Sequence, residues 1–120
     1  MGLGLDLEAG ARGGLALRRA VADACGRHGL LVSSPDDEPS VDDPEAELDL
    51  ADDLVGVEVY PQDDGLFADL STFEDSAAAS EQFARVLRDL VESVIEAGGR
   101  VRESDGGALV DPTRIGHLVP

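Results

Sequence analysis

Residues 76–99 constrain the fold most, because their apolar side chains recur with the period of an α-helix. The apolar positions share one face of that helix: Phe83, Val86, Leu87, Leu90, Val91, Val94 and Ile95. Ser76 is suited to cap the N-terminal end, and Gly98 and Gly99 to close the C-terminal end. A helix with one apolar stripe must bury that stripe against a single surface. The segment therefore predicts a helix lying on one face of a sheet.

A second helical pattern covers residues 15–29, nearer the N-terminus. Its apolar stripe comprises Leu17, Val21, Ala24 and Cys25. We expect Arg18 to point away from this stripe, together with the neighbouring charged residues. This helix, too, can cover only one surface.

Segments that alternate apolar and polar residues surround both helices, which is the pattern of half-buried strands. These segments are residues 3–9, 30–34, 55–61, 66–73, 100–104 and 108–110, while residues 48–54 are compatible with a helix or a strand. An Asp-Gly pair at 64–65 indicates a hairpin turn. The order predicts an α+β protein: two helices packed on one face of a mainly antiparallel sheet, in a ferredoxin-like α/β sandwich.

The length and composition favour a single domain over residues 1–120. A chain of 120 residues with 42% hydrophobic content can bury one core without a metal or a disulfide. The lone cysteine, Cys25, cannot form an intramolecular disulfide, which fits a reducing compartment. No stretch resembles a signal peptide or reaches the ~20 apolar residues of a membrane span. We therefore expect a cytoplasmic protein, and its oligomeric state is left open.

Charge is strongly segregated along the chain. The net charge is -17, and all nine basic residues are arginines. None of them lies between residues 28 and 84, an interval that holds 17 of the 26 acidic residues. Direct binding to nucleic acid or to an anionic membrane is disfavoured, because both need a cationic surface. A basic protein partner is favoured instead.

The densest part of this acidic block is residues 35–53, predicted to form a long, proline-containing loop between strands. A Ca²⁺ site is disfavoured there, since the stretch has no Asp-x-Asp-x-Asp-Gly frame and no glycine for a tight turn. Carboxylates of this loop and of the hairpin turn could instead match a cluster of arginines or lysines. The predicted partner-binding residues are Asp36, Asp37, Glu38, Asp42, Asp43, Asp63 and Asp64.

Residues with catalytic potential do not assemble into a recognisable site. Cys25 and His28 lie three positions apart on a helix, but two ligands do not make a metal site, His117 is a lone candidate for a third, and no orienting group for catalysis accompanies them. Glycines at 10–14 follow a strand, where phosphate-binding loops occur, yet they lack the P-loop and G-x-G-x-x-G patterns. Glu58 and Asp69 are expected at polar positions on the outer face of the hairpin. No catalytic residue, metal or cofactor is predicted.

The leading functional hypothesis is a small non-enzymatic protein that binds a basic partner by charge complementarity, in the manner of immunity proteins and antitoxins. One alternative is a small-molecule-binding or enzymatic α/β domain from a halophilic or GC-rich organism, in which the acidity is proteome-wide and says nothing of function. Another is a structural or assembly component that associates through an exposed edge of the strand at residues 55–59.

Overall fold

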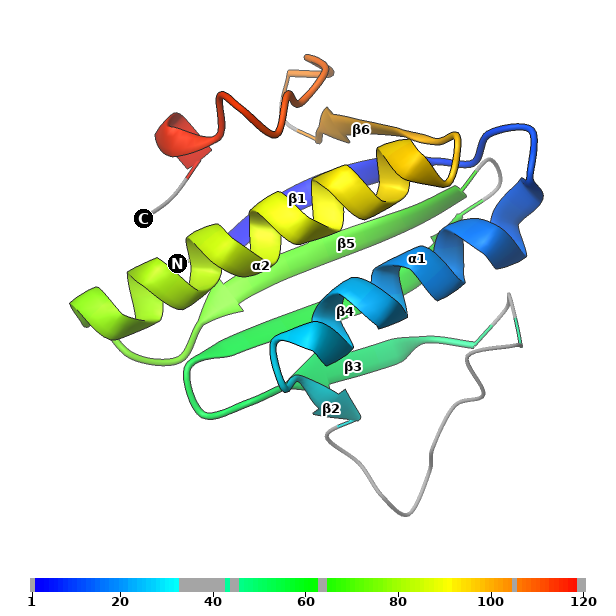
Figure 1. Ribbon diagram of the computed structural model, residues 1–120. Coiled ribbons are helices and arrows are strands. Elements are labelled where there is room, and N and C mark those ends of the chain that lie inside the picture. The colour runs from blue at the N-terminus through cyan, green and yellow to red at the C-terminus, as the bar shows by residue number, and fades with distance from the viewer. Residues whose placement is uncertain (1, 33–42, 44–45, 63–64, 105, 119–120) are drawn as a thin grey trace.

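The computed structural model of the chain describes residues 2–32, 43, 46–62, 65–104 and 106–118. Strands and helices follow one another in the order β1-α1-β2-β3-β4-β5-α2-β6 (Figure 1). Their bounds are β1 (Gly2–Glu8), α1 (Gly13–Arg27), β2 (Leu31–Val32), β3 (Leu48–Ala51), β4 (Val55–Gln62), β5 (Gly65–Thr72), α2 (Ala77–Glu96) and β6 (Arg100–Glu103), with a 3-10 turn, η2 (Gly116–Leu118).

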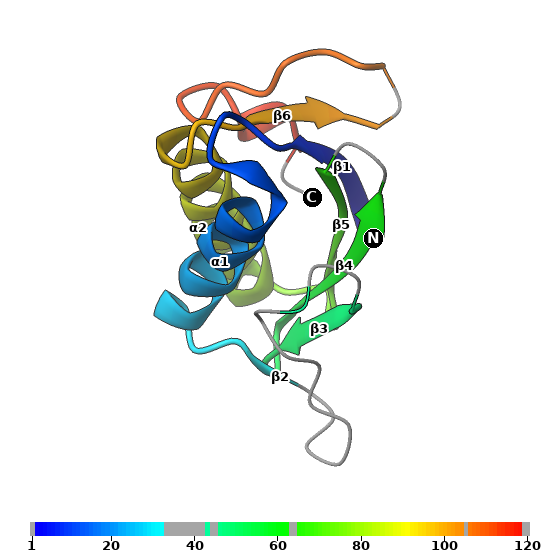
Figure 2. The same cartoon turned by 90° about the vertical axis from the view of Figure 1, so that its right-hand side faces the viewer.

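The strands form a six-stranded sheet in the order β2-β3-β4-β5-β1-β6, and every neighbouring pair is antiparallel. Both helices lie on the same side of this sheet, as the two orthogonal views show (Figures 1 and 2). The predicted α+β class is confirmed, with an antiparallel sheet and two helices. No described helix or strand covers the other side, which we call the uncovered face.

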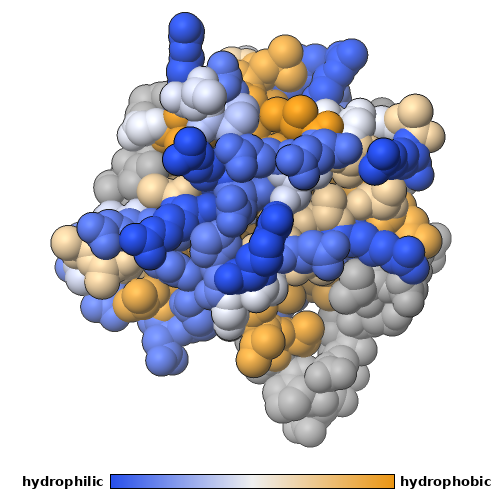
Figure 3. Space-filling model, viewed as in Figure 1, coloured by the Kyte–Doolittle hydropathy of each residue, from blue (hydrophilic) through white to orange (hydrophobic). Residues whose placement is uncertain are grey.

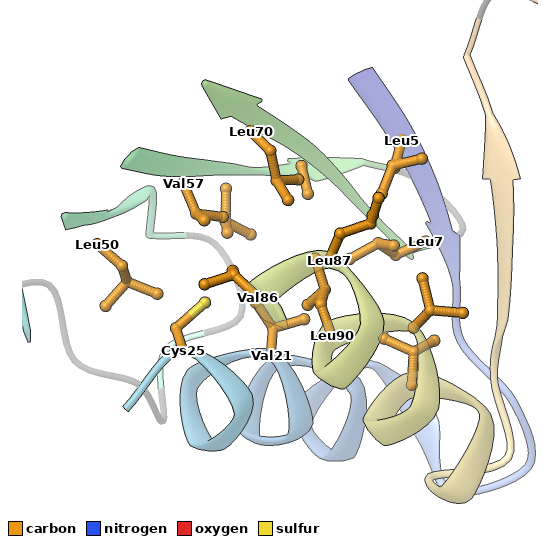
Figure 4. Packing of buried hydrophobic residues seen from close by; sticks show 14 of the residues in the cluster. Leu5, Leu7, Val21, Cys25, Leu50, Val57, Leu70, Val86, Leu87 and Leu90 are labelled. Carbon is orange, nitrogen blue, oxygen red and sulfur yellow. The ribbon is translucent and has the colours of Figure 1, made fainter. Parts of the chain in front are cut away.

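The core fills the space between the helices and the sheet (Figure 4). Alternate residues of each strand point into it, as the period-2 pattern predicts. The buried sheet residues are Leu5, Leu7, Leu48, Leu50, Val55, Val57, Val59, Leu66, Ala68, Leu70 and Val101. Because their side chains point to the helices, the intervening residues point to the uncovered face.

Helix α2 begins and ends as the sequence predicts. The Ser76 side chain accepts a hydrogen bond from the Ala79 amide at 3.1 Å, and Gly98 ends the helix with a positive φ of 86°. The apolar stripe is buried with one exception: Ile95 is 45% exposed, so its predicted burial is wrong. Successive residues of a helix are 100° apart. Val94 lies near the centre of the buried stripe, so Ile95, 100° away from it, falls beyond the edge of the stripe.

Helix α1 differs from expectation at Arg18, which is fully buried rather than pointing away from the core. The residue shares a helix face with Val21 and Cys25, three and seven positions further on. Its three guanidinium nitrogens have no hydrogen-bond partner in the described part of the chain. Burial lowers the pKa of Arg18, and the charge of Asp43 partly opposes that shift.

Three strand predictions need adjustment. Of the segment at 30–34, the structure describes residues 30–32, which contain the strand β2, and the ambiguous segment at 48–54 contains the strand β3. The segment at 108–110 forms no strand and contributes one isolated bridge, between Leu109 and Arg102. The acidic stretch at 35–53 therefore ends in a strand of the sheet, with Leu48 and Leu50 buried in the protein's own core.

β4 pairs on both sides, so the edge on which the assembly alternative depends is not exposed.

The turn between β1 and α1 packs closely against the end of α2. A Cβ atom on Gly10 would lie only 1.8 Å from the Gly98 carbonyl oxygen, which no side chain can tolerate without backbone movement. This glycine is therefore explained by packing, and it needs no phosphate ligand.

Among the described residues, neither helix is long and apolar enough to cross a bilayer.

Two alanine substitutions, one in this turn and one in the first turn of α1, should have opposite effects on stability. Gly10→Ala should lower the free energy of unfolding by about 1–3 kcal/mol, because the methyl group forces the turn away from α2. Gly14→Ala should raise it by about 0.5 kcal/mol, since the new Cβ meets nothing within 4 Å and alanine favours the helix. Urea unfolding followed by circular dichroism measures both. Equal unfolding midpoints for Gly10→Ala and the unmodified chain would contradict the close approach.

Candidate functional site

The structure describes only one of the seven predicted partner-binding residues. Asp43 is exposed, and its charge acts on the buried Arg18. The other six lie outside the described residues: Asp36, Asp37, Glu38, Asp42, Asp63 and Asp64. Their role in binding stays a prediction.

A row of three carboxylates crosses the uncovered face of the sheet. Asp49 on β3 pairs directly with Glu58 on β4, and Glu58 pairs with Asp69 on β5. Side chains directly opposite one another in an antiparallel pair have their Cβ atoms about 4.5–5.5 Å apart. We call these three residues the acidic row. Like charges at this separation repel one another and destabilise the sheet.

Nothing in the described part of the chain neutralises the acidic row. The ion pairs of the described residues lie elsewhere, as in the pair between Arg102 Nε and Glu8 Oε1 at 3.1 Å near the β6 edge. Strands β3, β4 and β5 contain no basic residue at all. Asp69 is only partly exposed, and its burial, followed by the charge of Glu58, raises the pKa of its carboxyl group.

An aromatic pair borders the acidic row on one side. Tyr60 and Phe67 are directly opposite each other on β4 and β5, with ring centroids 6.2 Å apart. The Tyr60 hydroxyl donates a hydrogen bond to Glu58 Oε2 at 2.5 Å. This bond, with smaller effects of burial and of nearby carboxylates, raises the pKa of Tyr60 to about 12. Tyr60 therefore orients one carboxylate of the row.

An apolar patch borders the acidic row on the other side, formed by Leu31, Ala51 and Phe73. Leu31 is 72% exposed and pairs with Ala51, which in turn pairs with Gly56. The Phe73 ring lies over Gly56, where a Cβ atom would be 2.5 Å from its Cζ. Along the strands, the face thus presents an apolar patch, an acidic row and an aromatic pair at intervals of about 7 Å, the repeat of two strand residues.

The helix side of the molecule carries a different surface (Figure 3). A groove of about 530 Å³ runs between α1 and α2, with Arg12, Arg19 and Arg27 along it. Asp23 and Glu96 also line the groove and offset much of that positive charge. Arg27 Nη2 donates to Ser93 Oγ at 2.5 Å, so this guanidinium already has a partner. The groove has mixed charge, unlike the acidic row.

The other chemically interesting side chains serve the fold. Cys25 is fully buried, and burial raises the pKa of its thiol to about 12, which keeps it protonated. His28 Nε2 lies 2.6 Å from Asp89 Oδ2 and joins the end of α1 to α2. Within the described ranges, no group of three His, Cys, Asp or Glu residues could hold a metal ion.

Most of this face is not evident from the sequence alone. The alternating pattern places Glu58 and Asp69 on the outer side of the hairpin, but it does not show that they form one row with Asp49. Nor does it assign a role to Tyr60 or Phe67. The signal in the sequence is the content of the outward positions: on β3, β4 and β5 these alternate positions hold three carboxylates and two aromatic rings among small or neutral polar residues, and no cation.

The titration of Tyr60 gives a direct test of its contact with Glu58. The chain has one tyrosine and no tryptophan, so its phenolate absorbance reports this residue alone. The absorbance should rise with a pKa near 12 for as long as circular dichroism shows the fold to be intact. Glu58→Gln should move the pKa towards the ordinary value of about 10. An ordinary pKa in the folded, unmodified chain would contradict the contact.

Replacing Asp69 should stabilise the protein in a pH-dependent way. At neutral pH, Asp69→Asn should raise the free energy of unfolding by about 0.5 kcal/mol, because it removes one of three repelling charges. The raised pKa means that the folded chain holds this proton more tightly than the unfolded chain. The gain is therefore complete above the folded pKa and disappears as the pH falls below about 4, where Asp69 is protonated in both states. Thermal unfolding from acid to neutral pH measures it.

The matched control for this experiment is Asp53→Asn, an exposed carboxylate between β3 and β4 that lies outside the row. It changes the net charge equally but should leave stability almost unchanged at every pH. Equal behaviour of the two variants would show that repulsion within the row is not significant.

No protein-family model matches the chain, and no curated protein and no solved structure is significantly similar.

Proposed function

We propose that this protein binds a basic protein partner through the uncovered face of its sheet and has no catalytic role. The observation that carries the proposal is the acidic row: three carboxylates in register on adjacent strands, with no cation among the described residues to balance them. Such a row lowers the stability of the free protein. A cationic partner would neutralise the three carboxylates. The repulsion that destabilises the free protein would then be absent from the complex, which favours binding.

A protein surface fits the row better than a single metal ion. Neighbouring strands are about 4.8 Å apart, so Asp49 and Asp69, two strands apart, are separated by about 10 Å. A bound ion needs several carboxylate oxygens within about 2.6 Å of it, and no group of three His, Cys, Asp or Glu residues in the described part of the chain is placed to provide them. Several arginine or lysine side chains spread over a partner surface can satisfy all three residues. The exposed Leu31 and Phe73 provide apolar contact beside them.

The partner we envisage has a surface built for phosphate groups, such as the active site of a nuclease. Carboxylates would occupy positions normally taken by phosphates, as in an immunity protein or an antitoxin, and would steer association in a salt-dependent way. The acidic residues at 36–43 and 63–64 would add to the same field. A cytoplasmic location is consistent with the single, buried and unpaired Cys25.

We also propose that the scaffold is a ferredoxin-like unit. In support, the four strands β6-β1-β5-β4 are adjacent in that order, and α1 and α2 follow β1 and β5 on one side of the sheet. Strands β2 and β3 would then be an addition that widens the uncovered face and contributes Asp49 and Leu31 to it.

The test is a comparison of two charge-matched double variants against the partner captured from the native cell extract. Glu58→Gln with Asp69→Asn neutralises the row, whereas Glu81→Gln with Glu96→Gln removes the same charge from α2 on the helix side. The first variant should weaken binding at least about tenfold and reduce its dependence on NaCl concentration, since two carboxylate contacts to the partner are lost. The second should bind almost as the unmodified chain does. Equal affinities of the two variants would rule out the uncovered face as the binding surface.

A further inference from the structure

We propose that the uncovered face selects arginine over lysine in its partner, an inference that rests on the proposed function. The occupant is an extended segment of a basic protein that places a guanidinium group between the acidic row and the aromatic pair. Charge alone would accept either basic residue. The arrangement of Glu58, Asp69, Tyr60 and Phe67 adds a preference that charge cannot provide.

The two inner carboxylates present their oxygens on adjacent strands. Glu58 and Asp69 are directly opposite each other, and Glu58 Oε2 is held by the Tyr60 hydroxyl at 2.5 Å. The carboxylate oxygens that accept no hydrogen bond remain for a partner. A guanidinium group has five N–H donors in a fixed planar fork and can bond both carboxylates at once. The ammonium group of lysine is a compact point charge without that planar fork.

The aromatic pair supplies the second element of selection. Tyr60 lies two residues beyond Glu58 on β4, and Phe67 lies two residues before Asp69 on β5, so both rings share the face with the carboxylates. Their planes are inclined by 34°. A guanidinium plane can stack on such a ring while its edge reaches a carboxylate, and arginine makes this contact more often than lysine.

Two features of the face restrict where the segment can lie. Across the strands towards β6, Arg102 is opposite Asp6 and bonds Glu8, so the cationic group there would repel an incoming arginine. Along the strands, on the side of the acidic row away from the aromatic pair, the apolar patch can receive an apolar side chain. The favoured occupant therefore carries an apolar residue two positions from an arginine, which matches the spacing of about 7 Å between the patch and the acidic row.

Fluorescein-labelled octaarginine and octalysine peptides test this inference on the full chain. Anisotropy gives both affinities at one ionic strength, and the fluorescence of Tyr60, the single tyrosine, reports binding at this face. Octaarginine should bind about tenfold more tightly than octalysine and should change the Tyr60 emission more strongly.

Two variants separate the arginine preference from charge. Phe67→Leu keeps an apolar side chain but removes a ring, so the ratio of the two affinities should fall towards one while octalysine binding is unchanged. Tyr60→Leu, read by anisotropy, should act in the same direction and serves if Phe67→Leu does not fold. Glu58→Gln with Asp69→Asn should weaken both peptides, and Glu81→Gln with Glu96→Gln should weaken neither substantially.

Three results would overturn the inference, and they separate it from the proposed function. If both peptides bind equally and both are lost in the Glu58→Gln, Asp69→Asn variant, the face binds cations without preference, so the proposed function survives and the inference fails. If the affinity ratio is unchanged in both ring variants, the preference is a property of the peptides and not of the aromatic pair. If the two charge-matched double variants behave alike, both the proposed function and the inference fail.

Discussion

The structure depends on the burial of two apolar helix stripes against one face of the sheet. Phe83, Leu87 and Leu90 of α2 are fully buried, and each contributes about 1.5–3 kcal/mol relative to an exposed position. Because both helices lie on the same side of the sheet, this burial involves only the side chains of that face and does not depend on the residues of the uncovered face. The uncovered face is therefore free to hold residues that lower stability. The acidic row is what the chain places there.

Much of the fold follows from the sequence because it rests on local periodicity. The stripe of α2, its Ser76 cap and the alternation on β1, β4 and β5 all appear in the structure, since each depends on residues close together in the chain. Arg18 shows the limit: helix periodicity places it near the stripe, but its charge argues for exposure, and only tertiary packing decides between them. Ile95 is the converse case: its apolar side chain predicts burial, but it lies just beyond the stripe and is exposed.

The candidate site is harder to predict from the sequence than the fold is, because it depends on the register between strands. Asp49, Glu58 and Asp69 are nine and eleven positions apart in the chain, and only the pairing of β3, β4 and β5 brings them into one row. A shift of one residue in either pairing would send one of them to the core side. Composition shows that the region is acidic, but it cannot show that three carboxylates become direct neighbours or that Tyr60 orients one of them.

Arg18 has a consequence for how this protein can change over time. A fully buried cation without a hydrogen-bond partner among the described residues is a cost that a single substitution by an apolar residue could remove. Such a substitution would act in the helix layer, on the opposite side of the sheet from the uncovered face. Substitutions that alter a surface often weaken the fold, and a stabilising change in the core would offset that loss. Arg18 thus links the stability of the core to the number of substitutions that the uncovered face can tolerate.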